Sequence, residues 1–142
     1  MNNLNNIEIA ARNKENYLKA KEAFNDKRVD EGILFYAADH EVKSKPSEKG
    51  RDGIQKFLEA LHQTWPDIQI RVEHAVAEDN WVMGRSVATA THSQVVLGIQ
   101  PTGKKITATF WDLHRFDDDG LIIETWNLMD SLAIMQQIGL LK

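Results

Sequence analysis

The spacing of the apolar residues changes abruptly at Pro66, and this change constrains the fold more than any other feature of the chain. Residues 51–65 (RDGIQKFLEALHQTW) place apolar side chains at helical spacing, with Asp52 expected to cap the N-terminus. Residues 67–76 (DIQIRVEHAV) then alternate apolar and polar side chains, which is typical of a half-buried strand. Pro66 disfavours helical dihedral angles at Trp65, so the helix is expected to end there.

Helices are predicted mainly in the first half of the chain and strands in the second. Helical spacing covers roughly 5–28 and a short stretch at 29–37, and a short strand is expected over 40–45. Long strands are predicted at 68–76, 81–96, 105–116 and 121–129, followed by a terminal helix from 131. This order predicts one α+β domain, 1–142, in which a curved antiparallel sheet packs against the N-terminal helices. Such a sheet forms a cone whose open end is a natural pocket.

Composition excludes several classes of function. The chain has no cysteine, so it has no zinc–thiolate site and no thiol nucleophile. Its formal net charge of −4, with scattered basic residues, argues against nucleic acid as a partner. No apolar run is long enough for a membrane span, and the first residues do not resemble a secretory signal, so a cytoplasmic location is expected. No histidine pair has a convincing metal-ligand spacing, and we expect neither a metal nor a cofactor.

Polar and aromatic side chains share one face of the last two predicted strands. If the turn at 117–120 joins them so that 112 pairs with 126, the even-numbered residues coincide. That face then holds Phe110, Asp112, His114, Glu124, Trp126, Leu128 and Asp130. A slip of the register by one residue would reverse this assignment. Burying unpaired charge is costly, so such a mixed face is more typical of a pocket lining than of a plain core.

Two roles remain open for Asp130 on spacing alone. It stands directly before SLAIMQQ and can cap the terminal helix, although Ser131 can do the same. A carboxyl in an apolar pocket has a raised pKa and can act as a general acid or base instead. His92, beside small residues in ATATH, is by itself more often a hydrogen-bonded structural histidine. Trp65, on the apolar side of its helix, is expected to contact a bound molecule.

Several blocks in order resemble the SnoaL-like polyketide cyclases of the NTF2-like superfamily. They are GRDGIQKFLEALHQTWPDI, VAEDNWVMGRSVATATHSQVVLGIQPTGKKI, HRFDDDGLIIETWNLMD and LAIMQQIG, and the similarity covers about 30–140. The resemblance implies an α+β barrel around a cone-shaped cavity, with an aspartate at the end of the last strand as acid and base in an intramolecular aldol closure. Asp130 matches this aspartate, and His114 best matches an assisting histidine. His92 and Trp126 match positions that shape the cavity.

The resemblance has two departures. Ser44 stands where many relatives have a histidine, and Ala90 replaces the glycine of a TGTH motif. We therefore expect Asp130 and His114 to be catalytic, and a small hydrophobic carbonyl compound to contact His92, Trp126, Phe110, Asp112, Leu128 and Trp65. Another NTF2-like enzyme (isomerase, dehydratase or epoxide hydrolase) or a non-catalytic binding or dimerisation module is the alternative. Trp81, Trp111 and Leu113 on the other face predict a homodimer through the sheets.

Overall fold

The computed structural model describes residues 4–44 and 49–141, and within them the strands form a single sheet. The strands are β1 (Tyr36–Val42), β2 (Gln69–Glu78), β3 (Trp81–Thr91), β4 (Lys105–Phe116) and β5 (Ile122–Met129), and their order across the sheet is β1-β5-β4-β3-β2. Strands β2 to β5 form the expected antiparallel meander. Strand β1 pairs in parallel with β5, so the sheet is mixed rather than wholly antiparallel.

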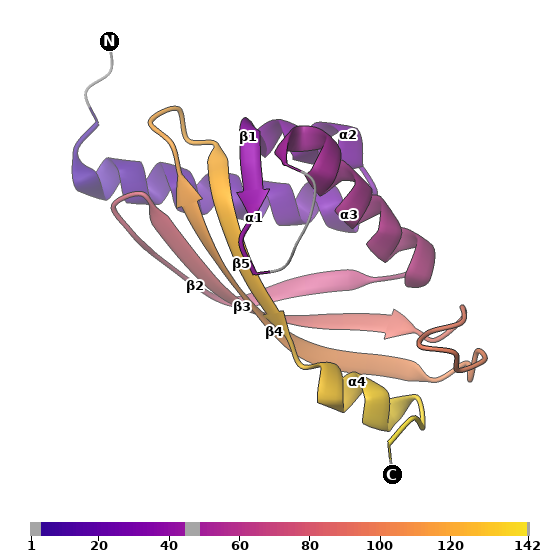
Figure 1. Cartoon of the computed structure of the whole chain (residues 1–142). Helices are drawn as coiled ribbons and strands as arrows, with labels where there is room; N and C mark the ends of the chain where they lie inside the picture. Colours follow the sequence, from indigo (N-terminus) through magenta and orange to yellow (C-terminus); the bar gives the residue numbers. More distant parts are fainter. Residues whose placement is uncertain (1–3, 45–48, 142) are drawn as a thin grey trace.

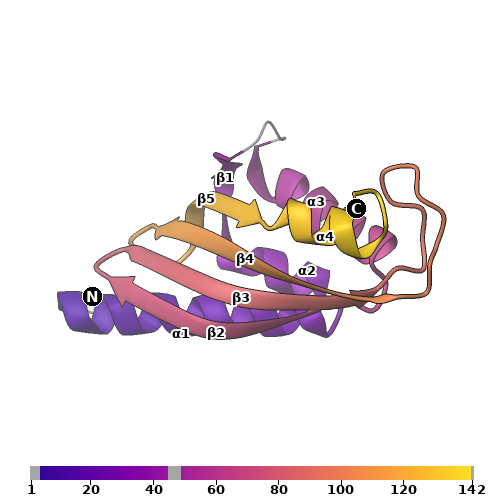
Figure 2. The ribbon, with the colours of Figure 1, turned by 90° about the horizontal axis from the view of Figure 1, so that it is seen from below.

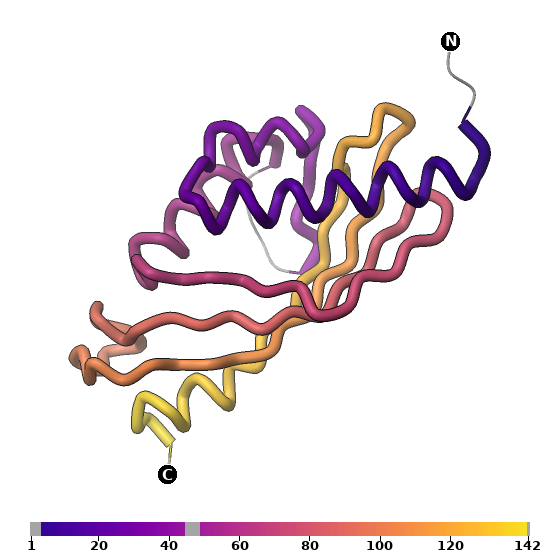
Figure 3. The backbone as a smooth tube through the Cα atoms, turned by 180° about the vertical axis from the view of Figure 1, so that it is seen from behind, coloured from indigo at the N-terminus to yellow at the C-terminus, as the bar shows by residue number. Residues whose placement is uncertain are grey.

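Helices cover one side of this curved sheet (Figures 1 and 3). They are α1 (Asn6–Asn25), α2 (Val29–Gly32), the 3-10 turn η1 (Ile33–Phe35) and α3 (Gly50–Thr64). Helix α1 packs on β2 and β3, and α3 packs on β1. The last helix, α4 (Ser131–Gln137), leaves the end of β5 and lies against β4. The predicted α+β architecture, with a curved sheet against N-terminal helices, is confirmed. Among the described residues, no helix is long and apolar enough to cross a membrane.

One helix prediction and one strand prediction differ from the structure in detail. Helix α3 begins at Gly50, whose φ of +82° suits glycine, and Lys49 precedes it without a side-chain cap. Asp52 therefore lies inside the first turn, and the prediction that it caps the helix is wrong. Strand β3 ends at Thr91 rather than at 96, because the chain turns away from the sheet after His92. The carbonyl of His92 accepts from the backbone N–H of Gly103, and the N–H of His92 donates to the carbonyl of Lys104.

The register of β4 against β5 decides which side chains face the helices. Next to the turn Phe116 pairs with Ile122, as the expected register requires. The next pair is Arg115 with Glu124, so one extra residue of β5 is accommodated there. Beyond this irregularity Asp112 pairs with Asn127 rather than with Trp126. Because successive side chains alternate between the two faces, this slip turns Thr125, Asn127 and Met129 inward.

Two groups of buried side chains form the core on the helix side of the sheet. One is centred on Tyr17, Phe116 and Ile122 near the β4–β5 turn. The other is centred on Phe24, Ile70 and Phe110 near the opposite end of the sheet. Members of both groups line one pocket, which therefore lies between them.

Candidate active site

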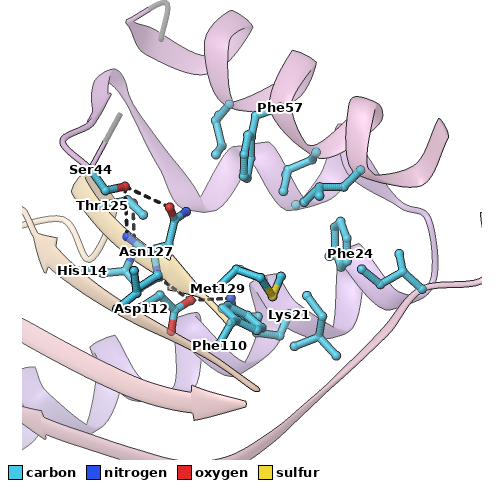
Figure 4. A pocket seen from close by; sticks show the side chains of 18 of the residues that line it. Lys21, Phe24, Ser44, Phe57, Phe110, Asp112, His114, Thr125, Asn127 and Met129 are labelled. Carbon is cyan, nitrogen blue, oxygen red and sulfur yellow. Dashed lines mark hydrogen bonds and ion pairs between the residues drawn. The ribbon is translucent and has the colours of Figure 1, made fainter. Parts of the chain in front are cut away.

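The pocket between the helices and the sheet has a volume of about 400 Å³ and two chemically different ends (Figure 4). The apolar part is lined by side chains from α1, α3, β2, β4 and β5, including Phe24, Phe57, Leu61, Trp65, Ile70 and Met129. The polar end holds Lys21, Ser44, Asp112, His114, Thr125 and Asn127. Pockets of this size with a few convergent polar groups are typical small-molecule sites.

Asp112 is the centre of the polar end. It is 3% exposed, and its carboxylate accepts hydrogen bonds from three side chains. The Tyr17 hydroxyl donates to Oδ1 at 2.6 Å, and the Lys21 ammonium donates to Oδ2 at 2.5 Å. His114 Nε2 lies 3.1 Å from the same Oδ2. The buried charge is thus both paired and hydrogen-bonded, as a buried carboxylate must be.

Gly84 makes room for one of these contacts. It pairs with Asp112 across β3 and β4, and the Tyr17 hydroxyl occupies the space where a side chain at this position would begin. A Cβ at this position would stand 1.9 Å from the Tyr17 hydroxyl oxygen. A side chain here would displace the Tyr17 hydroxyl, which donates a hydrogen bond to Asp112. Glycine is therefore required for close packing of α1 on the sheet.

Opposing effects set the ionisation of the cluster. Burial alone raises the pKa of Asp112, but the charges of Lys21 and His114 outweigh it and hold that pKa below its ordinary value. Burial, followed by the charge of Asp112, raises the pKa of Tyr17. The cluster therefore contains an ionised carboxylate, a neutral phenol and, at 2.5 Å from the carboxylate, an ammonium group.

His114 is positioned from both sides of its ring. Its Nε2 faces Asp112, and its Nδ1 lies 2.8 Å from the hydroxyl oxygen of Thr125 on β5. The ring also packs at 5.4 Å from the ring of Tyr17. These contacts fix the orientation of the imidazole at the edge of the pocket.

The structure brings together five of the predicted site residues, four within the pocket and Leu128 at its boundary, and separates the others. Phe110, Asp112, His114 and Trp65 line the pocket. The register slip turns Trp126 to the outer face, where its ring lies 5.9 Å from that of Trp81. Leu128 lies at the pocket boundary, but it is 71% exposed and pairs with the outward-facing Trp111. Trp126 therefore faces away from the cavity, contrary to the expected register, whereas Leu128 still borders the pocket as expected.

His92 is buried next to Trp65 but is not among the lining residues of the pocket. Its Nδ1 accepts a hydrogen bond from the backbone N–H of Thr102 and lies 2.9 Å from the Thr102 hydroxyl. These bonds tie the loop after β3 to the sheet, which is the structural role that its spacing alone favoured.

Asp130 occupies the position of a helix cap. Its side chain is exposed, and Oδ1 accepts a hydrogen bond from the backbone N–H of Ala133 at 3.1 Å. Ser131 and Ile134 of α4 line the pocket, whereas Asp130 does not. The capping alternative is confirmed, and the geometry gives no support to the catalytic expectation for this residue.

Sequence reasoning missed Tyr17 and Lys21, which donate to Asp112, Thr125, which contacts His114, and Asn127, which lines the polar end. One signal was available for Lys21. With Tyr17, Ala20 and Phe24 it follows the i, i+3, i+4, i+7 spacing of a buried helical face, and a lysine in such a stripe needs a buried partner. Thr125 and Asn127 face the pocket because of the register slip, and the residue types do not predict this slip. No group of three or more His, Cys, Asp or Glu among the described residues is placed to hold a metal ion.

Comparison with known proteins agrees with this architecture. The family model of the SnoaL-like polyketide cyclases matches residues 14–138. The chain belongs to this family. No curated protein matches the chain.

Solved structures of similar proteins share the fold along nearly the whole chain. AclR of Streptomyces galilaeus, described as a candidate hydroxylase, is 27% identical with a TM-score of 0.84, covering 94% of this chain and 88% of AclR. IdmH of Streptomyces antibioticus, described as a candidate polyketide cyclase, is 25% identical with a TM-score of 0.80, covering 89% of this chain and 98% of IdmH. A SnoaL-like polyketide cyclase of Agrobacterium tumefaciens has a TM-score of 0.78 at 20% identity, covering 89% and 98% of the two chains, and shows the fold alone.

Proposed function

We propose that this SnoaL-like protein closes a ring in a small hydrophobic carbonyl compound by an intramolecular aldol condensation without a cofactor. The observation that carries this proposal is the pairing of an ionised carboxylate, Asp112, with an ammonium group, Lys21, at the polar end of an apolar pocket. A base and a cation side by side are what enolate chemistry needs, because a negative charge forms on oxygen as the proton leaves carbon. The family match and the fold support a cyclase of this kind.

The proposed reaction starts with Asp112 taking a proton from a carbon that lies between two carbonyl groups. The enolate carbon attacks a second carbonyl carbon of the folded substrate, so one carbon–carbon bond forms and one carbonyl oxygen becomes an alkoxide. Asp112 returns its proton to this alkoxide, which regenerates the carboxylate. A carboxyl group with a lowered pKa is a weak base, so the proposal requires the activated carbon of a 1,3-dicarbonyl compound rather than that of a simple ketone.

Lys21 is proposed to stabilise the negative charge on oxygen. An ammonium group has three N–H donors, and Lys21 uses one on Asp112 Oδ2. The remaining donors can reach a substrate oxygen at the lining of the pocket. The apolar walls hold the two reacting ends of the substrate close together and in the orientation that the reaction needs.

The proposal is tested by hydrogen–deuterium exchange at the α-carbon of an aryl β-keto ester, followed by proton NMR above the buffer background. We expect the protein to accelerate exchange, and Lys21→Met to lose about a hundredfold of that acceleration because the oxyanion loses its cation. Lys21→Arg keeps the charge and is the matched control. No acceleration by the wild type, or equal rates for Lys21→Met and the wild type, would exclude the mechanism.

The epoxide hydrolase alternative has less support. It requires an arginine between two aspartates that hold a water molecule. Arg85 and Arg115 instead bond Glu73 and Glu124 away from the pocket, and none of its described lining residues is an arginine. A non-catalytic binding module would take up the β-keto ester without speeding exchange, so the same experiment separates that alternative.

We also propose that two copies associate through the outer face of the sheet, which Figure 2 shows with α1 behind the strands. Trp81, Met83, Trp111 and Leu128 share this face and are between 38% and 71% exposed. Large apolar side chains gathered on one sheet face are typical of an interface. Light scattering after size exclusion is expected to give a dimer for the wild type and a monomer for Trp111→Lys. A monomeric wild type at micromolar concentration contradicts this assembly.

A further inference from the structure

A histidine behind the pocket wall is joined to the proposed acid–base cluster. His40 on β1 is 1% exposed and does not line the pocket. Its Nε2 lies 2.8 Å from the hydroxyl oxygen of Thr125, and the same oxygen lies 2.8 Å from Nδ1 of His114. A single hydroxyl therefore bridges two imidazole rings from different strands.

The direction of every hydrogen bond in this row follows from Asp112. An ionised carboxylate only accepts, so Nε2 of His114 carries a proton and donates it to Oδ2. When His114 is neutral, its Nδ1 must accept, and within the described part of the chain the Thr125 hydroxyl is the group that can donate to it. The Thr125 oxygen is then left to accept, and His40 supplies a proton on Nε2. The row runs from His40 through Thr125 and His114 to Asp112.

His40 is suited to this role because it stays neutral. Burial first, and the charge of His114 second, lower the pKa of His40 to about 4. A neutral imidazole has one donor and one acceptor, and the two can exchange places. When His114 gains a proton on Nδ1, the Thr125 hydroxyl can no longer donate to it and must turn toward His40. His40 must then accept on Nε2 and carry its proton on Nδ1.

We propose that His40 is a positioning residue that, through the Thr125 hydroxyl, fixes which nitrogen of His114 carries the proton and changes tautomer when His114 becomes charged. In the wrong tautomer, His114 would turn a lone pair toward the Asp112 carboxylate and stop stabilising it. The change of tautomer transfers one proton along the row. A proton binds His40 at Nδ1, the proton on His40 Nε2 passes to the Thr125 oxygen, and the original Thr125 hydroxyl proton passes to His114 Nδ1. The catalytic part of this inference rests on the proposed function, whereas the hydrogen-bond part does not.

The groups around the two rings come from four elements. They are Tyr17 and Lys21 of α1, Tyr36 and Asp39 of β1, Asp112 of β4, and Thr125 of β5. Lys21 and Asp112 form an ion pair, and burial raises the pKa of Tyr36. Among the groups that bond directly to His114, Thr125 alone can reverse its donor and acceptor roles without gaining or losing a proton.

Nitrogen-15 NMR of the histidine rings in the ligand-free protein tests the inference without a substrate. At high pH, both His40 and His114 are expected to carry their proton on Nε2. Wherever the spectra show protons on both nitrogens of His114, His40 is expected to be in the Nδ1 tautomer. A His40 ring that keeps its Nε2 proton while His114 carries both protons overturns the proposal.

Thr125→Val removes the hydroxyl at nearly constant shape, and Thr125→Ser restores it. With valine, we expect His114 to populate both tautomers and His40 to stop responding to it, and with serine we expect the wild-type pattern. His40→Gln tests the same link from the other end, since its amide cannot change tautomer. An unaltered His114 tautomer in both Thr125→Val and His40→Gln counts against the link.

Kinetics on the β-keto ester separate positioning from simple packing. Thr125→Val is expected to lower kcat about tenfold while KM changes less than twofold, and Thr125→Ser to recover most of the rate, by analogy with other residues that orient a functional histidine. Equal loss in the valine and serine variants would mean that only packing is disturbed, which refutes the positioning role. If neither the wild type nor any variant turns over the β-keto ester, the proposed function fails. The NMR result still decides whether the hydrogen-bonded row from His40 to Asp112 exists.

Discussion

Two aspartates near the pocket illustrate how differently one functional group can be used. Asp112 is buried on the inner face of β4, bonded to Tyr17 and Lys21 and in contact with His114. Asp130 is exposed at the end of β5 and bonds the first turn of α4. Surroundings rather than residue type therefore distinguish a carboxylate suited to chemistry from one that ends a helix.

The two aspartates differ in whether folding replaces the water around the carboxylate by protein groups. The unfolded chain offers both groups to water, but only Asp112 exchanges that water for protein donors and a cation. Its ionised form depends on the integrity of the cluster, whereas Asp130 keeps access to solvent whatever its neighbours do. Changes to Asp112 are therefore expected to be costly, and changes to Asp130 mild.

The strongest test exchanges each carboxylate for its amide. Asp112→Asn is expected to lower the exchange rate of the β-keto ester about a thousandfold, because the base is lost. Asp130→Asn is expected to stay within about threefold of the wild type, since an asparagine caps a helix nearly as well. Circular dichroism checks that both variants fold. The opposite ranking of the two variants would return the catalytic role to Asp130.

Gly84→Ala probes the packing that surrounds Asp112. The added Cβ would meet the hydroxyl of Tyr17, so α1 must shift and the free energy of unfolding is expected to fall by up to about 3 kcal/mol. Gly32→Ala is the control, because the nearest atom to its added Cβ is 3.4 Å away. Urea denaturation of both variants measures the difference. An equal effect at the two positions would show that Tyr17 tolerates displacement.

Acidification probes the neutral histidine behind the cluster. His40 has a pKa of about 4 in the folded protein, below the ordinary value of 6.5, because of burial and then the charge of His114. The unfolded chain therefore binds this proton at higher pH, and the free energy of unfolding falls as the pH drops from about 6.5 to about 4. Between pH 7 and 4.5, the free energy of unfolding of His40→Gln is expected to fall by about 2 kcal/mol less than that of the wild type.

Urea denaturation at the two pH values measures this effect. His74→Gln, at an exposed position on β2, is the control for the loss of a histidine. The same acid sensitivity in His40→Gln and His74→Gln would contradict a special contribution of the buried ring.

The smallest effect is expected at the helix cap. Asp130→Ala removes the acceptor for the Ala133 N–H and is expected to lower the free energy of unfolding by about 1 kcal/mol, whereas Asp130→Ser restores most of it. Thermal denaturation followed by circular dichroism is sufficient. A loss of several kcal/mol would show that Asp130 has buried partners like those of Asp112.

Much of the fold was predictable because it depends on local periodicity. The change of spacing at Pro66 located α3 and β2, and the alternating residues located β4 and β5 to within a residue. The parallel pairing of β1 with β5 was not predictable, because no turn links strands so far apart in the chain. For the site, the sequence identified Asp112, His114, Phe110 and Trp65 as members, but it gave the leading role to Asp130.

The sequence by itself determined the order of the elements, the alternation of each strand and the family, since these properties depend on neighbours along the chain. Only the tertiary structure decided which alternating set of β5 faces the pocket. One extra residue between the Phe116–Ile122 and Arg115–Glu124 pairs turned Thr125 and Asn127 inward, and Trp126 and Leu128 outward. A strand has a period of two residues, so the smallest irregularity in pairing exchanges its two faces completely.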